Sequence, residues 1–197
     1  MIQVLRTALL CLGLVMVGCF RSPSARFYSL VSQDRNASPP QLSREGLDLE
    51  VFPIIFPQYL DDPRMVVRSS AHEMVRDEYE RWIEALDVNF RRVLLNDLSR
   101  HLKSSNVFSS EVYTQRRGAQ VVQVEVLQFD VSEAGTAVLK VRWAAAPTRE
   151  GLSSATLSVS EFAAQANGSS SEAQVAALSG LIDTFSLEVA QRFGLGK

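Results

Sequence analysis

The sequence predicts an α+β fold: an antiparallel sheet with two amphipathic helices packed on one face, as a two-layer sandwich. Several stretches alternate apolar and polar residues, which is typical of half-buried strands. Two longer stretches repeat apolar residues every three or four positions, the spacing of one helix face. Because each helix has a single apolar stripe, we expect both helices to cover one face of the sheet.

The N-terminal segment has the pattern of a signal peptide. Arg6 precedes the uncharged run 7–18, which is shorter than the roughly 20 residues of a membrane-spanning helix. The alternative for this run is a buried core helix. The run ends in "MVGC" (16–19), which is similar to a bacterial lipobox. A lipobox implies that a signal peptide, 1–18, is removed and that Cys19 becomes acylated.

An acylated Cys19 would bind the protein to a membrane through its acyl chains. We predict a short tether over 19–26 and a single periplasmic α+β domain over 27–197. Cys11 lies in the signal peptide, so neither a disulfide nor a cysteine-based metal site is expected in the mature chain. The formal net charge of −2 argues against nucleic acid as a partner. Covalent lipid on Cys19 is the only attached group that we expect.

The strands are predicted in the following order. Short strands are expected at 26–30 and 47–52, and the second alternates strictly. Pro53 and Pro57 end it, because proline has no amide hydrogen for the ladder. Three strands joined by short turns then form an antiparallel meander over 120–131, 136–146 and 155–162. The apolar positions of the first meander strand change face, which predicts a bulge or burial on both faces.

Two stretches are predicted to be helices. In the first, over 79–102, the apolar residues share one face, and the pattern is strongest over 87–103. The second follows Ser169-Ser170-Ser171-Glu172, which fits a capping box. Gly194 is placed as the glycine that ends this helix.

The stretch before the first helix has two interpretations. It can form a hairpin with arms at 64–68 and 73–76, or the helix can begin earlier, at a capping box on Ser70. We favour the hairpin because the letters "MVV" at 65–67 are β-prone. Trp82 and Trp143 fall on apolar stripes and are assigned to the core.

Side chains that carry catalysis or bind metals do not form a motif. His72 and His101 are far apart in sequence, and His101 suits the end of a helix, where a cation complements the dipole. No glycine-rich phosphate loop, nucleophile elbow or zinc-protease motif occurs. We therefore predict no catalytic residues, no metal and no enzymatic activity.

A more specific resemblance rests on the segment 51–86. Its residues occur in the order Pro53, Pro57, Tyr59-Leu60-Asp61, Pro63, Val66, Arg68, Glu80-Arg81-Trp82 and Leu86, after Tyr28-Ser29-Leu30 in the first strand. This order resembles the paraquat-inducible protein C family, also called membrane integrity-associated transporter subunits or ABC-type transport auxiliary lipoproteins. The resemblance covers nearly the whole chain. It implies a non-enzymatic lipoprotein that binds a periplasmic MCE-domain protein, the type that carries lipids between the two membranes of a Gram-negative envelope.

The resemblance also implies a location. Phe20 stands directly after the anchor cysteine, where aspartate is the usual inner-membrane retention signal in enteric bacteria. We therefore expect the inner leaflet of the outer membrane, facing the periplasm. A homo-oligomer matching a cyclic MCE partner is compatible with this role. Two other classes stay open: a structural or assembly lipoprotein of another envelope complex, and a periplasmic hydrolase.

The loop 57–64 is the candidate for partner binding. Tyr59 and Leu60 offer an apolar anchor, and Asp61, Asp62 and Arg64 offer a polar rim. The alternative is that Tyr59 and Leu60 fold back onto the edge of the sheet.

Overall fold

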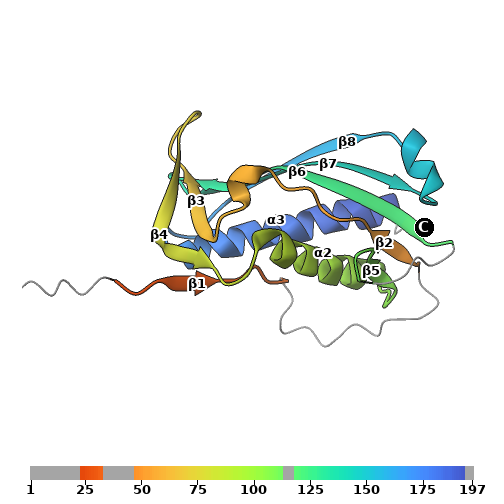
Figure 1. Cartoon of the computed structure of the whole chain (residues 1–197), viewed down its shortest axis with the longest axis horizontal. Coiled ribbons are helices and arrows are strands. Elements are labelled where there is room, and N and C mark those ends of the chain that lie inside the picture. Colours follow the sequence, from red (N-terminus) through yellow and green to blue (C-terminus); the bar gives the residue numbers. More distant parts are fainter. Residues whose placement is uncertain (1–22, 33–46, 113–117, 194–197) are drawn as a thin grey trace, which may run out of the picture.

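The computed structural model describes residues 23–32, 47–112 and 118–193. Within these residues the chain forms one sheet of eight strands and two long helices, so the predicted α+β class is confirmed (Figure 1). Helix α3 packs along β7 and β8, and α2 packs along α3. The elements are β1 (Arg26–Tyr28), β2 (Leu49–Val51), the single turn η2 (Gln58–Leu60), β3 (Arg64–Arg68), β4 (Met74–Trp82), α2 (Leu86–Leu102), β5 (Val107–Ser109), β6 (Gln120–Ser132), β7 (Thr136–Ala146), η3 (Glu150–Ser154), β8 (Ser158–Gln165) and α3 (Ser171–Arg192).

The sheet is mixed rather than antiparallel throughout. Strands β6, β7 and β8 form the predicted antiparallel meander. The other edge of β6 carries two short sets of strands that meet it in parallel. The set β2–β5 joins the start of β6, and the set β3–β4–β1 joins its end. Alternation along a sequence does not reveal strand direction, so these parallel pairings escaped prediction.

Between the two sets, the edge of β6 has a gap in its ladder. Ile55 forms an isolated bridge with Glu125, and Val67 pairs with Val131 farther along. The chain between them leaves the ladder and forms η2, with Pro57 as the residue before its first turn. Proline cannot donate a ladder hydrogen bond, so the sequence itself opens the gap.

The meander follows the predicted pattern closely. The pairing of β6 with β7 shifts register between Val126 and Gln128, so the predicted bulge is confirmed. Burial along β7 alternates from Thr136 to Trp143, and its buried residues Ala137, Leu139, Val141 and Trp143 belong to the core. Strand β8 begins at Ser158 rather than at 155, because the turn η3 and its exit take up the preceding residues.

The first helix begins at Leu86, so the prediction that it starts at Tyr79 is wrong. The hairpin is confirmed, but β4 continues past the expected end at Arg76 and runs to Trp82. Irregular pairing with β3 puts Trp82 in the core and leaves Tyr79 and Ile83 exposed. The three- and four-residue spacing therefore arose from an irregular strand and the connection after it, not from a helix face.

The N-terminus of α3 also differs in detail. Ser170 is the N-cap residue, and its hydroxyl accepts a hydrogen bond from the Ala173 N–H at 3.2 Å. The cap is thus one residue later than a capping box on Ser169 requires. Gly194, like Cys19 and the rest of 1–22, lies outside the described residues. In the part of the chain that the structure describes, no helix is long and apolar enough to cross a membrane.

The core lies between the sheet and the helices. Phe90 of α2 meets Phe56 and Phe129 edge to face, with ring centroids 5.3 Å apart in each pair. Trp143 of β7 meets Phe185 of α3 at 6.0 Å. Both tryptophans are buried, as predicted. Strand β5 was not predicted, since three residues are too few to show a period.

A buried asparagine ties the chain after β1 to α2. The Leu30 N–H donates to Oδ1 of Asn89 at 2.6 Å, and Nδ2 of Asn89 donates to the Leu30 carbonyl oxygen at 3.3 Å. Leu30 and Asn89 are both almost fully buried. Strand β1 is only three residues long, so these two hydrogen bonds add to its pairing with β4 in fixing the N-terminal segment to the fold.

Candidate functional site

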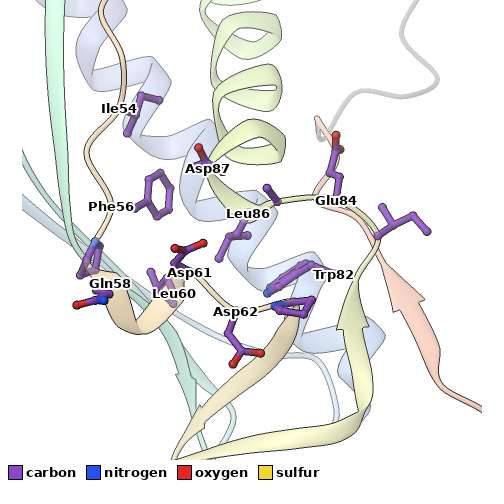
Figure 2. Close-up of a pocket in the computed structure, with 14 residues that line it drawn as sticks. Ile54, Phe56, Gln58, Leu60, Asp61, Asp62, Trp82, Glu84, Leu86 and Asp87 are labelled. Atoms are coloured by element: carbon purple, nitrogen blue, oxygen red, sulfur yellow. The ribbon is translucent and has the colours of Figure 1, made fainter.

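A groove of about 700 Å³ opens beside the gap in the edge of β6 (Figure 2). One wall is the stretch 54–63 with η2, and the other is the end of β4 with the start of α2. Both walls coincide almost wholly with the segment 51–86 that carries the family resemblance. The described residues that line it are Ile54, Phe56, Pro57, Gln58, Leu60, Asp61, Asp62, Pro63, Trp82, Ile83, Glu84, Ala85, Leu86 and Asp87.

The inside of the groove is apolar. Leu60, Trp82 and Leu86 belong to the core, and part of each side chain reaches the groove. Phe56 packs against this core from the same wall as Leu60, opposite Trp82 and Leu86. Figure 2 shows Phe56 and Trp82 on opposite sides, with Leu86 between them. A surface of this kind accepts an apolar side chain of a ligand or partner.

The rim of the groove is acidic. Asp61, Asp62, Glu84 and Asp87 contribute four carboxylates, and the described lining residues include no lysine or arginine. Glu84 forms an ion pair with Arg92 of α2. Asp87 lies in the first turn of α2, where a negative charge complements the helix dipole. Asp62 also pairs with arginines, so the negative charge that the rim presents rests mainly on Asp61 and Asp87.

Tyr59 does not line the groove, although its neighbours do. Its hydroxyl donates to Oδ2 of Asp130 at 3.0 Å and accepts from the Phe129 N–H at 3.3 Å. Burial raises the pKa of Tyr59 far above its usual range, and the carboxylate of Asp130 adds to this. Tyr59 thus supplies a hydrogen-bond acceptor to the edge of β6 that faces away from β7, at a point where no strand pairs with that edge.

Asp130 is the centre of a buried polar cluster under the gap. Its side chain is 2% exposed and binds the Arg68 guanidinium through both oxygens, at 3.1 and 2.7 Å. Nε2 of Gln128 donates to it at 2.9 Å. The planar guanidinium matches a carboxylate in this two-point geometry. Asp130 therefore links β6, β3 and, through Tyr59, η2. Sequence reasoning missed it, because one aspartate in a strand carries no distinctive signal.

Asp62 and Arg64 belong to a second polar cluster, on the surface. Asp62 accepts hydrogen bonds from Nε and Nη2 of Arg64 at 3.0 and 2.9 Å, and Arg76 lies 3.1 Å from it. Arg64 also pairs with Glu78 at 2.8 Å. The hydrogen bonds from Arg64 hold the pKa of Asp62 well below its usual range and raise that of Arg64. This cluster fixes the exit from η2 into the β3–β4 hairpin.

The five residues predicted to bind a partner therefore divide into two groups. Leu60, Asp61 and Asp62 line the groove, although Leu60 is 5% exposed and belongs to the core. Tyr59 and Arg64 instead fix the loop to the hairpin and to β6. The folded-back arrangement of Tyr59 and Leu60 is thus the one observed, and the partner-binding role of the loop stays a prediction. Sequence reasoning missed the other wall, 82–87, because it was assigned to a helix.

The two histidines occupy separate places. His72 is exposed at the end of the β3–β4 hairpin. His101 lies near the end of α2, with its Nε2 2.8 Å from Oδ1 of Asp183 in α3 and Arg100 bound to the same carboxylate. Within 23–32, 47–112 and 118–193, no three histidine, cysteine, aspartate or glutamate side chains gather as metal ligands would.

Comparison with solved structures shows where this fold occurs. A crystal structure of an uncharacterised protein aligns with 87% of this chain and 100% of its own, with a TM-score of 0.70 and 16% identity. A Xanthomonas campestris protein of the DUF330 family aligns with 86% of this chain and 94% of its own, with a TM-score of 0.67 and 15% identity. A weaker likeness, with a TM-score of 0.41 and 13% identity, links 77% of this chain to 93% of the PelC dodecamer subunit from Paraburkholderia phytofirmans. At these identities the likeness concerns the fold alone.

Sequence comparison identifies the family. Among proteins with curated descriptions, none matches this sequence significantly. The family described as the ABC-type transport auxiliary lipoprotein component matches residues 28–190, from β1 almost to the end of α3. An auxiliary component acts with other components of a transport system, and a lipoprotein is consistent with a membrane-anchored place in the cell envelope. This chain therefore belongs to the family of ABC-type transport auxiliary lipoprotein components.

Proposed function

We propose that this lipoprotein is anchored by acylated Cys19 to the inner leaflet of the outer membrane and binds a periplasmic MCE-domain protein of a lipid-transport system. The observation that carries the proposal is the groove. Its two walls include half of the residues that carry the family resemblance, among them Pro57, Asp61, Pro63 and Trp82. Asp61 is exposed at this open surface, so packing of the core does not account for it.

The length of the tether supports a docking role rather than a bridging role. Phe27 is eight residue steps from Cys19, so a fully extended chain spans about 26–29 Å. The domain then stays close to its leaflet and does not reach across the periplasm. A longer partner has to come to it and needs a surface to bind.

The chemistry of the groove specifies what the partner presents. An apolar interior with four acidic side chains around it fits a segment that carries an apolar side chain flanked by lysine or arginine. We propose that such a segment of the MCE-domain protein occupies the groove. The role is binding, without catalysis, metal or a cofactor other than the lipid on Cys19.

Charge reversal on the rim tests this docking site. Asp61→Lys places a positive charge on the groove, and Glu133→Lys makes the same charge change in the exposed turn between β6 and β7. Each lipoprotein is purified from its own membranes after mild cross-linking, and co-purified proteins are identified by mass spectrometry. We expect Asp61→Lys to lose most of the MCE-domain protein and Glu133→Lys to retain it.

The outcomes separate the two halves of the proposal. If no MCE-domain protein co-purifies with the unchanged lipoprotein, the assignment of the partner fails. If the partner co-purifies equally well with Asp61→Lys, the partner stands and the groove is not where it docks. Partial unfolding is detected by comparing melting temperatures of the two variants.

The anchor is tested independently of the partner. Replacement of Cys19 with alanine should abolish labelling with radioactive palmitate and leave a soluble or uncleaved protein whose domain still folds. Separation of the two membranes by density should place the unchanged protein with the outer membrane. Fatty-acid labelling that persists in Cys19→Ala would contradict the lipobox.

A further inference from the structure

Three large apolar side chains are exposed together where β1 pairs with β4. Phe27 is 58% exposed, Tyr79 43% and Ile83 60%. We call these three residues, with Arg81 between them, the β1–β4 patch. Exposed apolar residues scattered singly over a surface are ordinary, whereas a cluster of them marks a surface that contacts something.

Strand pairing places these residues on one face. β1 and β4 are parallel, with Phe27 opposite Arg81, and the Ile83 N–H donates to the Tyr28 carbonyl oxygen at 2.9 Å. Alternate residues of a strand point to opposite faces. Glu80 and Trp82 are buried on the inner face, so the residues before, between and after them point outward.

The patch combines apolar and cationic character. Arg81 stands opposite Phe27, is half-buried as a residue, and its guanidinium donates to the Glu78 carbonyl oxygen. Arg26, at the start of β1, stands opposite Glu80 and pairs with it, so it lies on the other face of the strand and is not part of the patch. Aromatic and aliphatic side chains with arginine beside them suit the boundary between acyl chains and lipid phosphates. The carboxylates that face this region are Asp77, Glu78 and Glu84, and two of them are held by Arg64 and Arg92.

The course of the chain indicates which surface meets the patch. In the sequence, the tether starts at Cys19, and β1 begins only seven residues later, at Arg26. The tether therefore ends directly on the patch, at most about 26–29 Å of chain from the anchor. Strand β8, the opposite edge of the sheet, is five strand spacings away, roughly 24 Å at 4.8 Å per spacing.

From this placement we propose that the β1–β4 patch rests on the headgroup region of the leaflet that holds Cys19 and fixes the orientation of the domain on the membrane. The inference deepens the proposed function, because it rests on acylation of Cys19. Ile83 also lines the groove, so this orientation sets the groove beside the lipid surface rather than far from it.

Tryptophan substitution tests the contact directly. Phe27→Trp and Ile83→Trp report on the patch, and Val159→Trp on β8 is a matched control, since Val159 is also 58% exposed. The mature chain has Cys19 as its only cysteine, so its thiol can be coupled to a maleimide lipid in vesicles of phosphatidylethanolamine and phosphatidylglycerol. Some of the lipids carry bromine on their acyl chains and quench a tryptophan that touches them. Emission of the unchanged chain is subtracted, because Trp82 and Trp143 are common to all samples.

We expect brominated lipid to quench both patch probes at least about twofold more strongly than the probe on β8, as shallow insertion of apolar side chains requires. Equal quenching at all three positions, or none at the patch, would overturn the inference. The second patch probe decides the matter if Phe27→Trp does not fold. Chemical coupling keeps the result independent of acylation in cells and of any MCE partner, which palmitate labelling and co-purification test separately.

Discussion

The two sides of β6 are built in different ways. On one side, β7 and β8 follow it directly in sequence, pair antiparallel and are covered by α3. On the other side, strands of three to nine residues return from distant parts of the chain, and most of their pairings are parallel. Apolar packing holds the first side, whereas buried polar contacts such as Arg68 with Asp130 join the pieces of the second. We call the second side, formed by β2–β5 and β3–β4–β1, the divided edge. The groove and the exposed patch both lie there, so the meander serves as scaffold and the divided edge provides the candidate binding surfaces.

The largest expected effect comes from removing an aromatic ring on the meander side. Phe185 is fully buried, and its ring contacts those of Trp143 and Phe162. We expect Phe185→Ala to lower the free energy of unfolding by about 3–5 kcal/mol, because the cavity adds to the lost burial. Urea denaturation followed by circular dichroism measures this. Val159→Ala on exposed β8 is the control and should change stability by less than about 0.5 kcal/mol. A loss from Phe185→Ala as small as that of the control would show that packing on the meander side is not what stabilises the fold.

On the divided edge, we expect the polar cluster around Asp130 to contribute more to stability than apolar packing does. Asp130→Ala leaves Arg68 and the Tyr59 hydroxyl without their carboxylate, and we expect a loss of about 3 kcal/mol, as for other broken buried ion pairs. Hydrogen exchange should accelerate in β3, β4 and η2 while β7 and β8 stay protected. Exchange that accelerates uniformly would mean that the two sides unfold together. Glu133→Ala in the nearby turn is the control.

A smaller effect on stability is expected from the Tyr59 hydroxyl, which accepts a hydrogen bond from β6 at the gap in the ladder. Tyr59→Phe removes the acceptor for the Phe129 N–H and the donor to Asp130. We expect a loss of about 1 kcal/mol in thermal denaturation. Tyr79→Phe removes an exposed hydroxyl and should leave the melting temperature unchanged. Equal melting temperatures for Tyr59→Phe and the unchanged protein would mean that water replaces the hydroxyl and that the gap needs no side chain to close it.

The smallest expected effect is a change in the free energy of unfolding at acid pH. The pKa of Asp62 is lowered in the folded state by hydrogen bonds from Arg64, so the carboxylate stabilises the fold above its unfolded pKa of about 3.9. That stabilisation is lost as the pH falls below this value and through the folded pKa. Denaturation at pH 6 and pH 3 should therefore show a difference between the unchanged protein and Asp62→Asn that shrinks at the lower pH. Arg64→Gln should weaken the dependence without abolishing it, because the backbone N–H of residue 64 and the Arg76 guanidinium still stabilise the carboxylate; an unchanged dependence would show that the Arg64 side chain is not its main cause.

The same contrast explains what could be predicted from the sequence. The meander, its bulge, the body of both helices and the β3–β4 hairpin follow from local alternation and spacing, because each pairs with its neighbour in sequence. The parallel pairings of β1 and β2 do not, since no local pattern records which distant strand lies alongside. Glu50 illustrates the limit: alternation predicts that it faces solvent, yet it is fully buried and bound to Arg149, almost a hundred residues away.

The candidate site was predictable only in part, for the same reason. The loop 57–64 stood out through its prolines and its resemblance to a family, and it does form one wall of the groove. The opposite wall, 82–87, was hidden because an irregular strand imitated helical spacing. The cluster around Asp130 was hidden because its members come from η2, β3 and β6 and meet only in the folded chain.

The parallel pairing of β1 also determines how the molecule responds to mechanical force. If Cys19 is lipid-anchored, a force that draws the domain away from its leaflet would place the N-terminal segment under tension. A pull along β1 shears its few hydrogen bonds to β4 together instead of peeling them one by one. After β1, the side-chain amide of Asn89 in α2 forms hydrogen bonds with both the N–H and the carbonyl oxygen of Leu30. Tension on the N-terminal segment is therefore shared between β4 and α2 instead of falling on one strand pairing alone.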